Sequence, residues 1–224
     1  PAHHGTINFH HLIVCTMTIP KQKNPQPPPC RLRVGTSGYS YPEWIDAGFY
    51  PPGTPAREML TQYCRHFSIT ELNYTWYQMP KAATLERMVP KVPVDFGFAV
   101  KLTRTMTHEI DPHGWRGQAT QFREGIAPLI QNRRLSAVLI QLPPSFHRQR
   151  AHRLYLSQLL DKLAGLPLAV EFRHRSWATD KVFTGLENRG VEPDIEVDRR
   201  PEDHIADRDP QLDRGLAELK ATLE

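Results

Sequence analysis

The sequence contains little cysteine and no long apolar run. Its three cysteines, Cys15, Cys30 and Cys64, have neither the spacing of a metal motif nor the even number of a disulfide set, so we expect free thiols in a reducing compartment. No stretch of about 18 consecutive apolar residues occurs, which argues against a membrane span. The apolar run at 12–15 is too short for a signal-peptide core, and no small-residue cleavage site follows it. We therefore expect a cytoplasmic protein.

Several motifs that identify enzyme classes are also missing. The sequence has no phosphate-binding P-loop, no dinucleotide fingerprint, no nucleophile elbow and no Cys/His metal motif. Two glutamates and one histidine near expected strand ends leave a divalent metal open, but no metal-site residues are predicted. No cofactor is identified at this level.

Charge is distributed unevenly along the chain. The net charge is +4, but residues 191–224 carry 11 acidic and 5 basic residues, a net charge of −6, which leaves +10 on the remainder. A basic body suits a small anionic ligand or a nucleic acid. Its arginines are scattered along expected helices without interleaved aromatic residues, which favours a solvated surface over a nucleic-acid interface.

The first part of the chain is rich in proline. Residues 1–16 show no periodicity, and four prolines lie between Lys21 and Cys30. Proline fixes φ and removes a backbone donor, so we expect residues 1–31 to form a disordered, proline-rich leader.

Apolar periodicity then predicts alternating strands and helices. The expected strands are Leu32–Thr36, Ile69–Tyr74, Phe96–Val100, Leu135–Leu142 and Leu168–Phe172. The expected helices are Pro55–Phe67, Ala82–Val89, Gln118–Gln131, His152–Ala164 and Asp180–Arg189. This alternation predicts an α/β fold with a parallel sheet. About five βα units without a dinucleotide fingerprint fit part of a (β/α)8 barrel, with functional groups at the carboxyl ends of its strands.

The residues at the expected strand ends form six short motifs. These are Gly35-Thr36-Ser37-Gly38-Tyr39-Ser40-Tyr41, Phe49-Tyr50-Pro51, Glu71-Leu72-Asn73-Tyr74-Thr75-Trp76-Tyr77, Lys101 with Thr107-His108, Gln141-Leu142-Pro143-Pro144-Ser145-Phe146, and Glu171-Phe172-Arg173-His174 with Ser176-Trp177. In this order and spacing they resemble the YecE-like family (domain of unknown function 72) over about residues 32–177. The resemblance implies a TIM-barrel-like fold and no particular activity.

The family pattern stops after Trp177, so we assign a truncated YecE-like domain to residues 32–186. The acidic tail, 187–224, contains Gly190-Val191-Glu192-Pro193-Asp194-Ile195-Glu196-Val197 and Asp209-Pro210-Gln211-Leu212. It resembles the C-terminal end of tricorn-type serine peptidases, but without their catalytic serine region. We expect a join of two unrelated segments within 178–188. The alternative is a divergent barrel end with 192–197 as a sixth strand, which Pro193 disfavours.

Five strands cannot close an eight-stranded barrel. We therefore expect the first and fifth strands to be open edges that promote oligomerisation or aggregation. In this form the chain is expected to have little activity.

Four ionisable residues at the strand ends are the candidate catalytic groups: Glu71, Lys101, His108 and Glu171. A glutamate there could act as a general base, or form a structural ion pair, such as Glu171 with Lys101 or Arg173. Lys101 could bind an anion or form a Schiff base, and anion binding is the favoured interpretation. His108 could exchange protons or could have no chemical role.

A second set is expected to bind the substrate: Ser37, Tyr41, Asn73, Tyr77, Gln141, Arg173 and Trp177. Arg173 could hold a carboxylate or phosphate through two hydrogen bonds. The amides and aromatic rings would orient the ligand, with strand-end capping and ordinary packing as alternatives. The leading hypothesis is an uncharacterised protein of the YecE-like family, truncated and of low activity in this form, whose intact relatives would be enzymes acting on a small anionic substrate. The alternatives are a basic nucleic-acid-binding module and a non-functional chimeric fragment.

Overall fold

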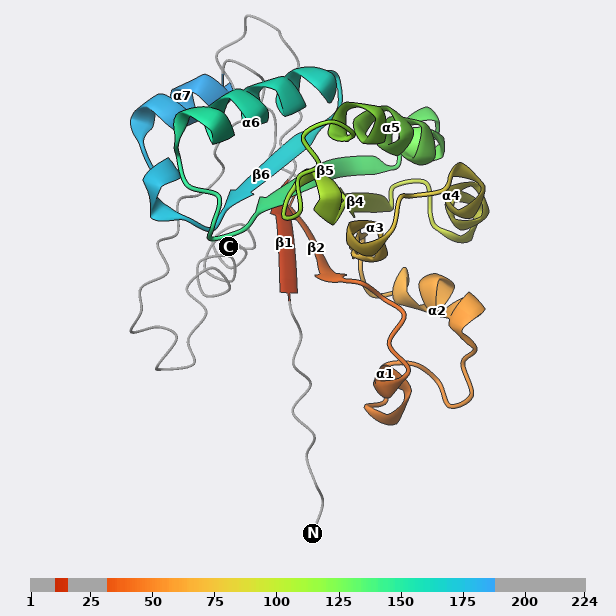
Figure 1. The fold of residues 1–224 in the computed structure, drawn as a ribbon. Helices are drawn as coiled ribbons and strands as arrows, with labels where there is room; N and C mark the ends of the chain where they lie inside the picture. Colours follow the sequence, from red (N-terminus) through yellow and green to blue (C-terminus); the bar gives the residue numbers. More distant parts are fainter. Residues whose placement is uncertain (1–10, 16–31, 188–224) are drawn as a thin grey trace, which may run out of the picture.

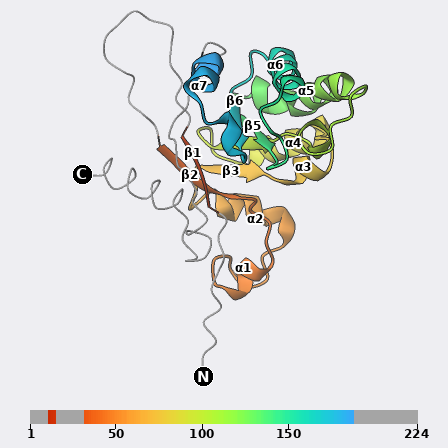
Figure 2. The ribbon, with the colours of Figure 1, turned by 60° about the vertical axis from the view of Figure 1, so that its left-hand side comes forward.

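The computed structural model describes residues 11–15 and 32–187 and places all of its strands in one sheet (Figure 1). The strands lie side by side in chain order, and five of them, β2 to β6, run parallel. Their bounds are β1 His11–Cys15, β2 Leu32–Ser37, β3 Ile69–Leu72, β4 Gly97–Lys101, β5 Leu135–Leu142 and β6 Leu168–Phe172. The parallel strands curl into half of a barrel (Figure 2), which confirms the expected partial TIM-barrel-like fold.

The helices cover one face of this sheet. Figure 1 shows α2, α4, α5, α6 and α7 following one another around its outside, as expected for successive right-handed βα units. The α-helices are α1 Glu43–Asp46, α2 Ala56–Tyr63, α3 Tyr74–Tyr77, α4 Ala82–Met88, α5 Trp115–Gln131, α6 Arg150–Lys162 and α7 Asp180–Glu187. Three 3-10 helices occur at η1 Val89–Lys91, η2 Arg104–Met106 and η3 Arg175–Trp177. None of the helices in the described part of the chain is long and apolar enough to cross a membrane.

Alternating side chains give the sheet two different faces. On the outer face, large apolar residues of the strands belong to the same core cluster as residues of α5 and α6, for example Val100, Ile140 and Phe122. The inner face carries mainly small or polar residues, because the register aligns Glu71 with Ser37 and Ala99, and Gln141 with Glu171. The inner face is therefore the one that carries ionisable groups toward the carboxyl ends of the strands.

Close backbone approach fixes the helix layer. Gly125 of α5 lies against the carbonyl of Pro80, where a β-carbon would collide with the backbone.

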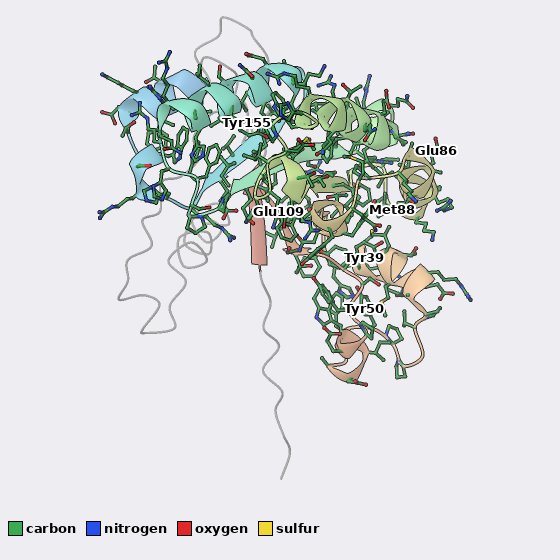
Figure 3. The ribbon with its side chains drawn as sticks, in the orientation of Figure 1. Tyr39, Tyr50, Glu86, Met88, Glu109 and Tyr155 are labelled. Carbon is green, nitrogen blue, oxygen red and sulfur yellow. The ribbon has the colours of Figure 1, made fainter. Side chains whose placement is uncertain are left out.

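Near α1, the hydroxyl of Tyr50 donates to the carbonyl of Tyr39 at 2.5 Å, and both residues lie in the lower part of the molecule in this view (Figure 3). A buried tyrosine whose hydroxyl has a partner keeps the benefit of ring burial without leaving a polar group unsatisfied.

Two features differ from the sequence analysis. Strand β1 lies within the stretch expected to be a disordered leader, and it pairs antiparallel with β2, so the first edge of the parallel sheet is covered. The expected strand 69–74 ends at Leu72, and α3 begins at Tyr74. The hydroxyl of Thr75 explains this early end, because it contacts the carbonyls of Leu72 and Lys101 at 2.6 Å each. The acidic tail and nearly all of the leader lie outside the described residues.

Candidate functional site

The candidate site lies at the carboxyl edge of the half-barrel. Parallel strands end on the same side of a sheet, so residues far apart in the sequence meet there. Ser37 and Lys101 are the last residues of β2 and β4, and Glu71, Gln141 and Glu171 are the penultimate residues of β3, β5 and β6. The register places Gln141 directly beside Glu171, and Ser37 directly beside Glu71.

Glu71 is the most deeply buried ionisable group of the site, with 3% of its surface exposed. The hydroxyl of Ser37 donates to its Oε1 at 3.2 Å, and that hydroxyl accepts a hydrogen bond from Nδ2 of Asn73. The hydroxyl of Tyr41 donates to the carbonyl of Ser37 at 2.5 Å. Three residues predicted to bind substrate are thus joined around this carboxyl group.

Burial raises the pKa of Glu71, and this effect outweighs the opposing influence of Lys101 and of the Ser37 hydrogen bond. No ion pair between described residues includes Glu71. A buried carboxyl group with a raised pKa holds its proton more tightly than an exposed one and can exchange it with a bound molecule.

Lys101 is half-buried next to this carboxyl group. The pKa of Lys101 is lowered, because the effect of burial outweighs the opposing influence of Glu71 and Glu171. Its ammonium lies 5.8 Å from the centre of the Trp76 ring, within the range of a cation–π contact. None of the ion pairs in the described part of the chain includes Lys101. Its positive charge is therefore available to an anion.

Glu171 is held on both of its oxygens. Nε2 of Gln141 donates to Oε2 at 2.6 Å, and Nε of Arg173 donates to Oε1 at 2.8 Å. The sequence left open whether Glu171 pairs with Lys101 or with Arg173, and the structure shows the pair with Arg173. This pair is about half exposed, so its contribution is mainly to orient the carboxylate and the guanidinium rather than to stabilise the fold.

His108 lies in the loop that follows η2 and contacts Trp76. The indole Nε1 of Trp76 donates to Nδ1 of His108 at 3.4 Å, and the hydroxyl of Thr107 lies 3.0 Å from the same nitrogen. Because an indole nitrogen can only donate, Nδ1 is the acceptor and the neutral ring carries its proton on Nε2. Burial first, then Lys101 and Arg173, lower the pKa of His108, which favours this neutral form.

Trp76 is a site residue that the sequence analysis quoted in a motif but did not select. It contacts both Lys101 and His108, and its ring meets that of His108 edge to face at 5.1 Å. Its spacing was the one signal in the sequence that could have identified it as a site residue. Trp76 lies five residues after Glu71, at the end of the same strand–helix turn. Aromatic residues are so common in cores that this signal alone did not separate a site residue from a packing residue.

The two remaining aromatic candidates differ in their surroundings. Tyr77 is 69% exposed and packs edge to face against Trp76. Trp177 is 3% exposed, and its ring stacks on Phe146 and Phe172. The structure therefore places Tyr77 at the edge of the site and Trp177 inside the packing beneath the loops.

The described side chains contain no group of three or more His, Cys, Asp or Glu residues that could hold a metal ion. One surface hollow, of about 290 Å³, lies between α5 and α6. Another, of about 540 Å³, lies at the amino ends of β2 to β4. Neither is lined by a residue predicted from the sequence to bind or react. The ionisable side chains at the carboxyl edge, Glu71, Lys101, His108, Glu171 and Arg173, lie outside both hollows.

Comparison with known proteins agrees with this geometry. A profile of the family described as "Protein of unknown function DUF72" matches residues 33–212. The protein YunF of Bacillus subtilis is 33% identical over 150 residues, covering 65% of this chain and 52% of YunF. The protein YecE of Escherichia coli K12 is 29% identical over 176 residues, covering 76% of this chain and 60% of YecE. The chain thus spans about half to three-fifths of the length of these relatives.

The crystal structure of a DUF72 family protein from Thermotoga maritima is also similar. It has a TM-score of 0.60 and 35% sequence identity, over 70% of this chain and 61% of that one. A stretch of 40 residues is 60% identical to Tricorn protease homolog 1 of Streptomyces coelicolor, which is 18% of this chain and 4% of that protein. The expected tricorn resemblance of the tail is therefore confirmed, although the DUF72 profile extends to residue 212.

The profile covers well over half of the chain, and the shared fold and sequence agree with it. The join within 178–188 lies at the margin of the described residues and stays a prediction. The chain belongs to the DUF72 family, as its strand-end motifs predicted.

Proposed function

We propose that the carboxyl edge of the half-barrel binds a small organic anion and exchanges a proton with it through Glu71. The observation that carries this proposal is the burial of Glu71 beside Lys101, without an ion pair between them. Burying a carboxyl group with so few partners costs stability. Such groups are concentrated at functional sites, where the altered pKa is useful.

Each neighbouring group has a part in this proposal. Lys101 and Arg173 attract the anion and hold it, Lys101 as a point charge and Arg173 through its planar donors. Glu71 accepts or donates the proton at the buried end of the ligand. Neutral His108 donates a hydrogen bond from Nε2 to a ligand oxygen, because its Nδ1 is already an acceptor. Glu171 and Gln141 keep Arg173 in place.

Anion binding can be tested with a matched pair of lysine variants. A panel of small carboxylates and phosphate esters is screened by thermal shift, and each hit is titrated by calorimetry. Lys101→Met is expected to weaken binding of a hit by about tenfold or more, since a charged partner of the anion is lost. The control is Lys81→Met, which removes an exposed lysine before α4. Equal affinities for both variants would refute the role of Lys101.

Proton exchange has its own measurement. Calorimetry of the same ligand in two buffers of different ionisation enthalpy counts the protons taken up or released on binding. Glu71→Gln is expected to abolish this proton transfer, whereas Glu86→Gln on the outside of α4 (Figure 3) should leave it unchanged. If Glu71→Gln takes up or releases the same number of protons on binding as the wild type does, the site holds an anion without acid–base chemistry.

A further inference from the structure

Two loops at the carboxyl edge are locked together beside the site. One joins β5 to α6, and the other joins β6 to η3. The backbone N–H of Arg148 donates to the hydroxyl oxygen of Ser176 at 2.8 Å. The indole of Trp177 donates to the carbonyl of Phe146 at 2.6 Å, and their rings stack at 5.5 Å. Side chains on these loops are therefore held in fixed positions relative to one another.

The locked loops bring two histidines face to face. The rings of His147 and His174 are 3.9 Å apart and inclined by 20°. Nδ1 of His174 accepts a hydrogen bond from the backbone N–H of Ser176 at 3.2 Å. Loss of hydration, followed by His147 and Arg175, lowers the pKa of His174. Stacked neutral rings are compatible, but two charged rings at this distance repel each other unless a negative charge lies nearby.

No carboxylate in either loop supplies that negative charge. Residues 143–160 and 172–179 contain five arginines and three histidines, but no aspartate or glutamate. The Nε atom of Arg148 is buried and has no hydrogen-bond partner among the described residues. Of the five arginines, Arg173 is the one with an ion pair in the described part of the chain, with Glu171. Apart from the pair of Arg173 with Glu171, the positive charges of these loops have no ion-pair partner among residues 11–15 and 32–187.

The start of α6 adds donors to the same place. This helix of 13 residues begins at Arg150, directly after the loop, and Gln149 at its N-cap provides no side-chain hydrogen bond. The first backbone N–H groups of such a helix are free and carry partial positive charge. Free amides combined with guanidinium groups match the three oxygens of a phosphoryl group better than the two of a carboxylate.

We propose that the His147–His174 stack, Arg148, Arg175 and the start of α6 form a second anion site that binds a phosphoryl group. The site is distinct from the Glu71 pocket and does not depend on the function proposed for it. The phosphoryl group could belong to a small phosphorylated molecule or to a nucleic-acid backbone. The negative charge of the bound anion stabilises a proton taken up by an imidazole of the stack, so phosphate is expected to bind more tightly at pH 6 than at pH 8.

The test compares two double variants of the full chain. Inorganic phosphate is titrated while the C–H resonances of the histidines are followed by NMR, at pH 6 and pH 8. The variant His147→Gln/Arg175→Gln is expected to weaken phosphate binding at pH 6 by about tenfold or more. The matched control Arg65→Gln/His66→Gln also removes one guanidinium and one imidazole, both exposed at the amino edge. It should change the affinity by less than about twofold.

A second arm separates the two sources of phosphate. A single-stranded oligothymidylate is titrated at rising salt concentration. Tighter binding of the oligonucleotide than of phosphate, with a steep salt dependence that the double variant reduces, indicates a nucleic-acid backbone. Binding of phosphate without such an advantage indicates a small phosphorylated ligand. The proposal is wrong if neither phosphate nor the oligonucleotide binds, or if they bind His147→Gln/Arg175→Gln and the wild type equally. The phosphate titration is followed through the resonance of His174, which lies outside the Glu71 site, so failure here and failure of the Glu71 site can be told apart.

Discussion

At the scale of the residue, Glu71 combines an ionisable carboxyl group with a buried position. This residue is 3% exposed, and among the described residues its carboxyl group receives a single side-chain hydrogen bond, from Ser37. A folded protein keeps such a group at a cost, because the ionised form has lost most of its hydration. Glu171, on the same face of the sheet, avoids this cost by having a partner on each oxygen.

Replacing this carboxyl group should stabilise the protein in a pH-dependent way. The raised pKa means that the folded state holds the Glu71 proton more tightly than the unfolded state does. The free energy of unfolding therefore falls as pH rises from the ordinary value of 4.5 through the raised pKa. Glu71→Gln should leave the free energy of unfolding nearly unchanged at pH 4.5 and raise it by about 1 kcal/mol at pH 8.

Urea denaturation at both pH values measures this difference, with Glu86→Gln as the control without a pH-dependent effect. A Glu71→Gln variant that is less stable than the wild type at pH 8 would show that the ionised carboxylate contributes a net favourable interaction.

Residue identity at the site was largely predictable, and residue pairing was not. The sequence pointed to Glu71, Lys101 and Glu171 because each follows an apolar strand, and parallel strands end at one edge. It could not choose between Lys101 and Arg173 as the partner of Glu171, since both lie within reach of that edge. The choice depends on side-chain direction, and Arg173 lies two residues away on the same side of the strand.

At the scale of the element, the contact between the β5–α6 loop and η3 determines the role of Trp177. Its indole is enclosed by Phe146 and Phe172, and its N–H satisfies the carbonyl of Phe146. A buried carbonyl left without a partner costs about 1–3 kcal/mol. This geometry favours the packing role of Trp177 over the role of an aromatic wall for the substrate.

Trp177→Phe tests that assignment. The variant keeps a ring in the stack but loses the hydrogen bond to Phe146, so we expect the free energy of unfolding to fall by about 2 kcal/mol. Affinity for an anion at the Glu71 site should stay within about twofold of the wild type. The matched control, Trp76→Phe, also removes an indole N–H but should weaken anion binding with a smaller loss of stability. The opposite pattern, unchanged stability with lost binding, would assign Trp177 to the substrate.

The longer elements were predicted well because their apolar pattern extends over many residues. The expected strands 135–142 and 168–172 coincide with β5 and β6, and the expected helix 82–89 differs from α4 by one residue. The short helix α1 was missed, because four residues are too few to show a helical period. The strand β1 was missed for a different reason: its partner β2 lies beyond a proline-rich stretch, and such long-range pairing leaves no local signal.

At the scale of the whole molecule, the half-barrel has one covered edge and one open edge. Strand β1 pairs along β2, whereas β6 has a neighbour only on the β5 side among the described residues. The expectation of two open edges therefore applies to β6 alone. An unpaired strand edge is a template for another strand, and natural proteins often protect it with an inward-facing charge.

Ala169→Lys introduces such a charge on the inner face of β6. The register places Ala169 beside Leu139, on the side that carries Lys101. We expect the apparent mass of the wild-type chain in multi-angle light scattering to rise between about 10 and 200 µM and that of the variant to rise much less. Ala83→Lys on the exposed side of α4 is the control, and far-UV circular dichroism confirms that each variant is folded. A wild-type mass that stays that of a monomer over this range would contradict the prediction.

The antiparallel direction of β1 also limits the shape of any assembly. A sheet with two free ends can add molecules head to tail without limit, which produces fibres. Here the β2 end is already occupied by a strand running in the opposite direction, so the β6 edge of one molecule cannot join the β2 edge of the next. Two contacts remain among the described strands: β6 against β6, which uses the same surface twice, and β6 against the outer edge of β1, which joins two different surfaces. Pairing of β6 with β6 ends at a symmetric dimer, whereas pairing of β6 with β1 adds molecules one after another without closing.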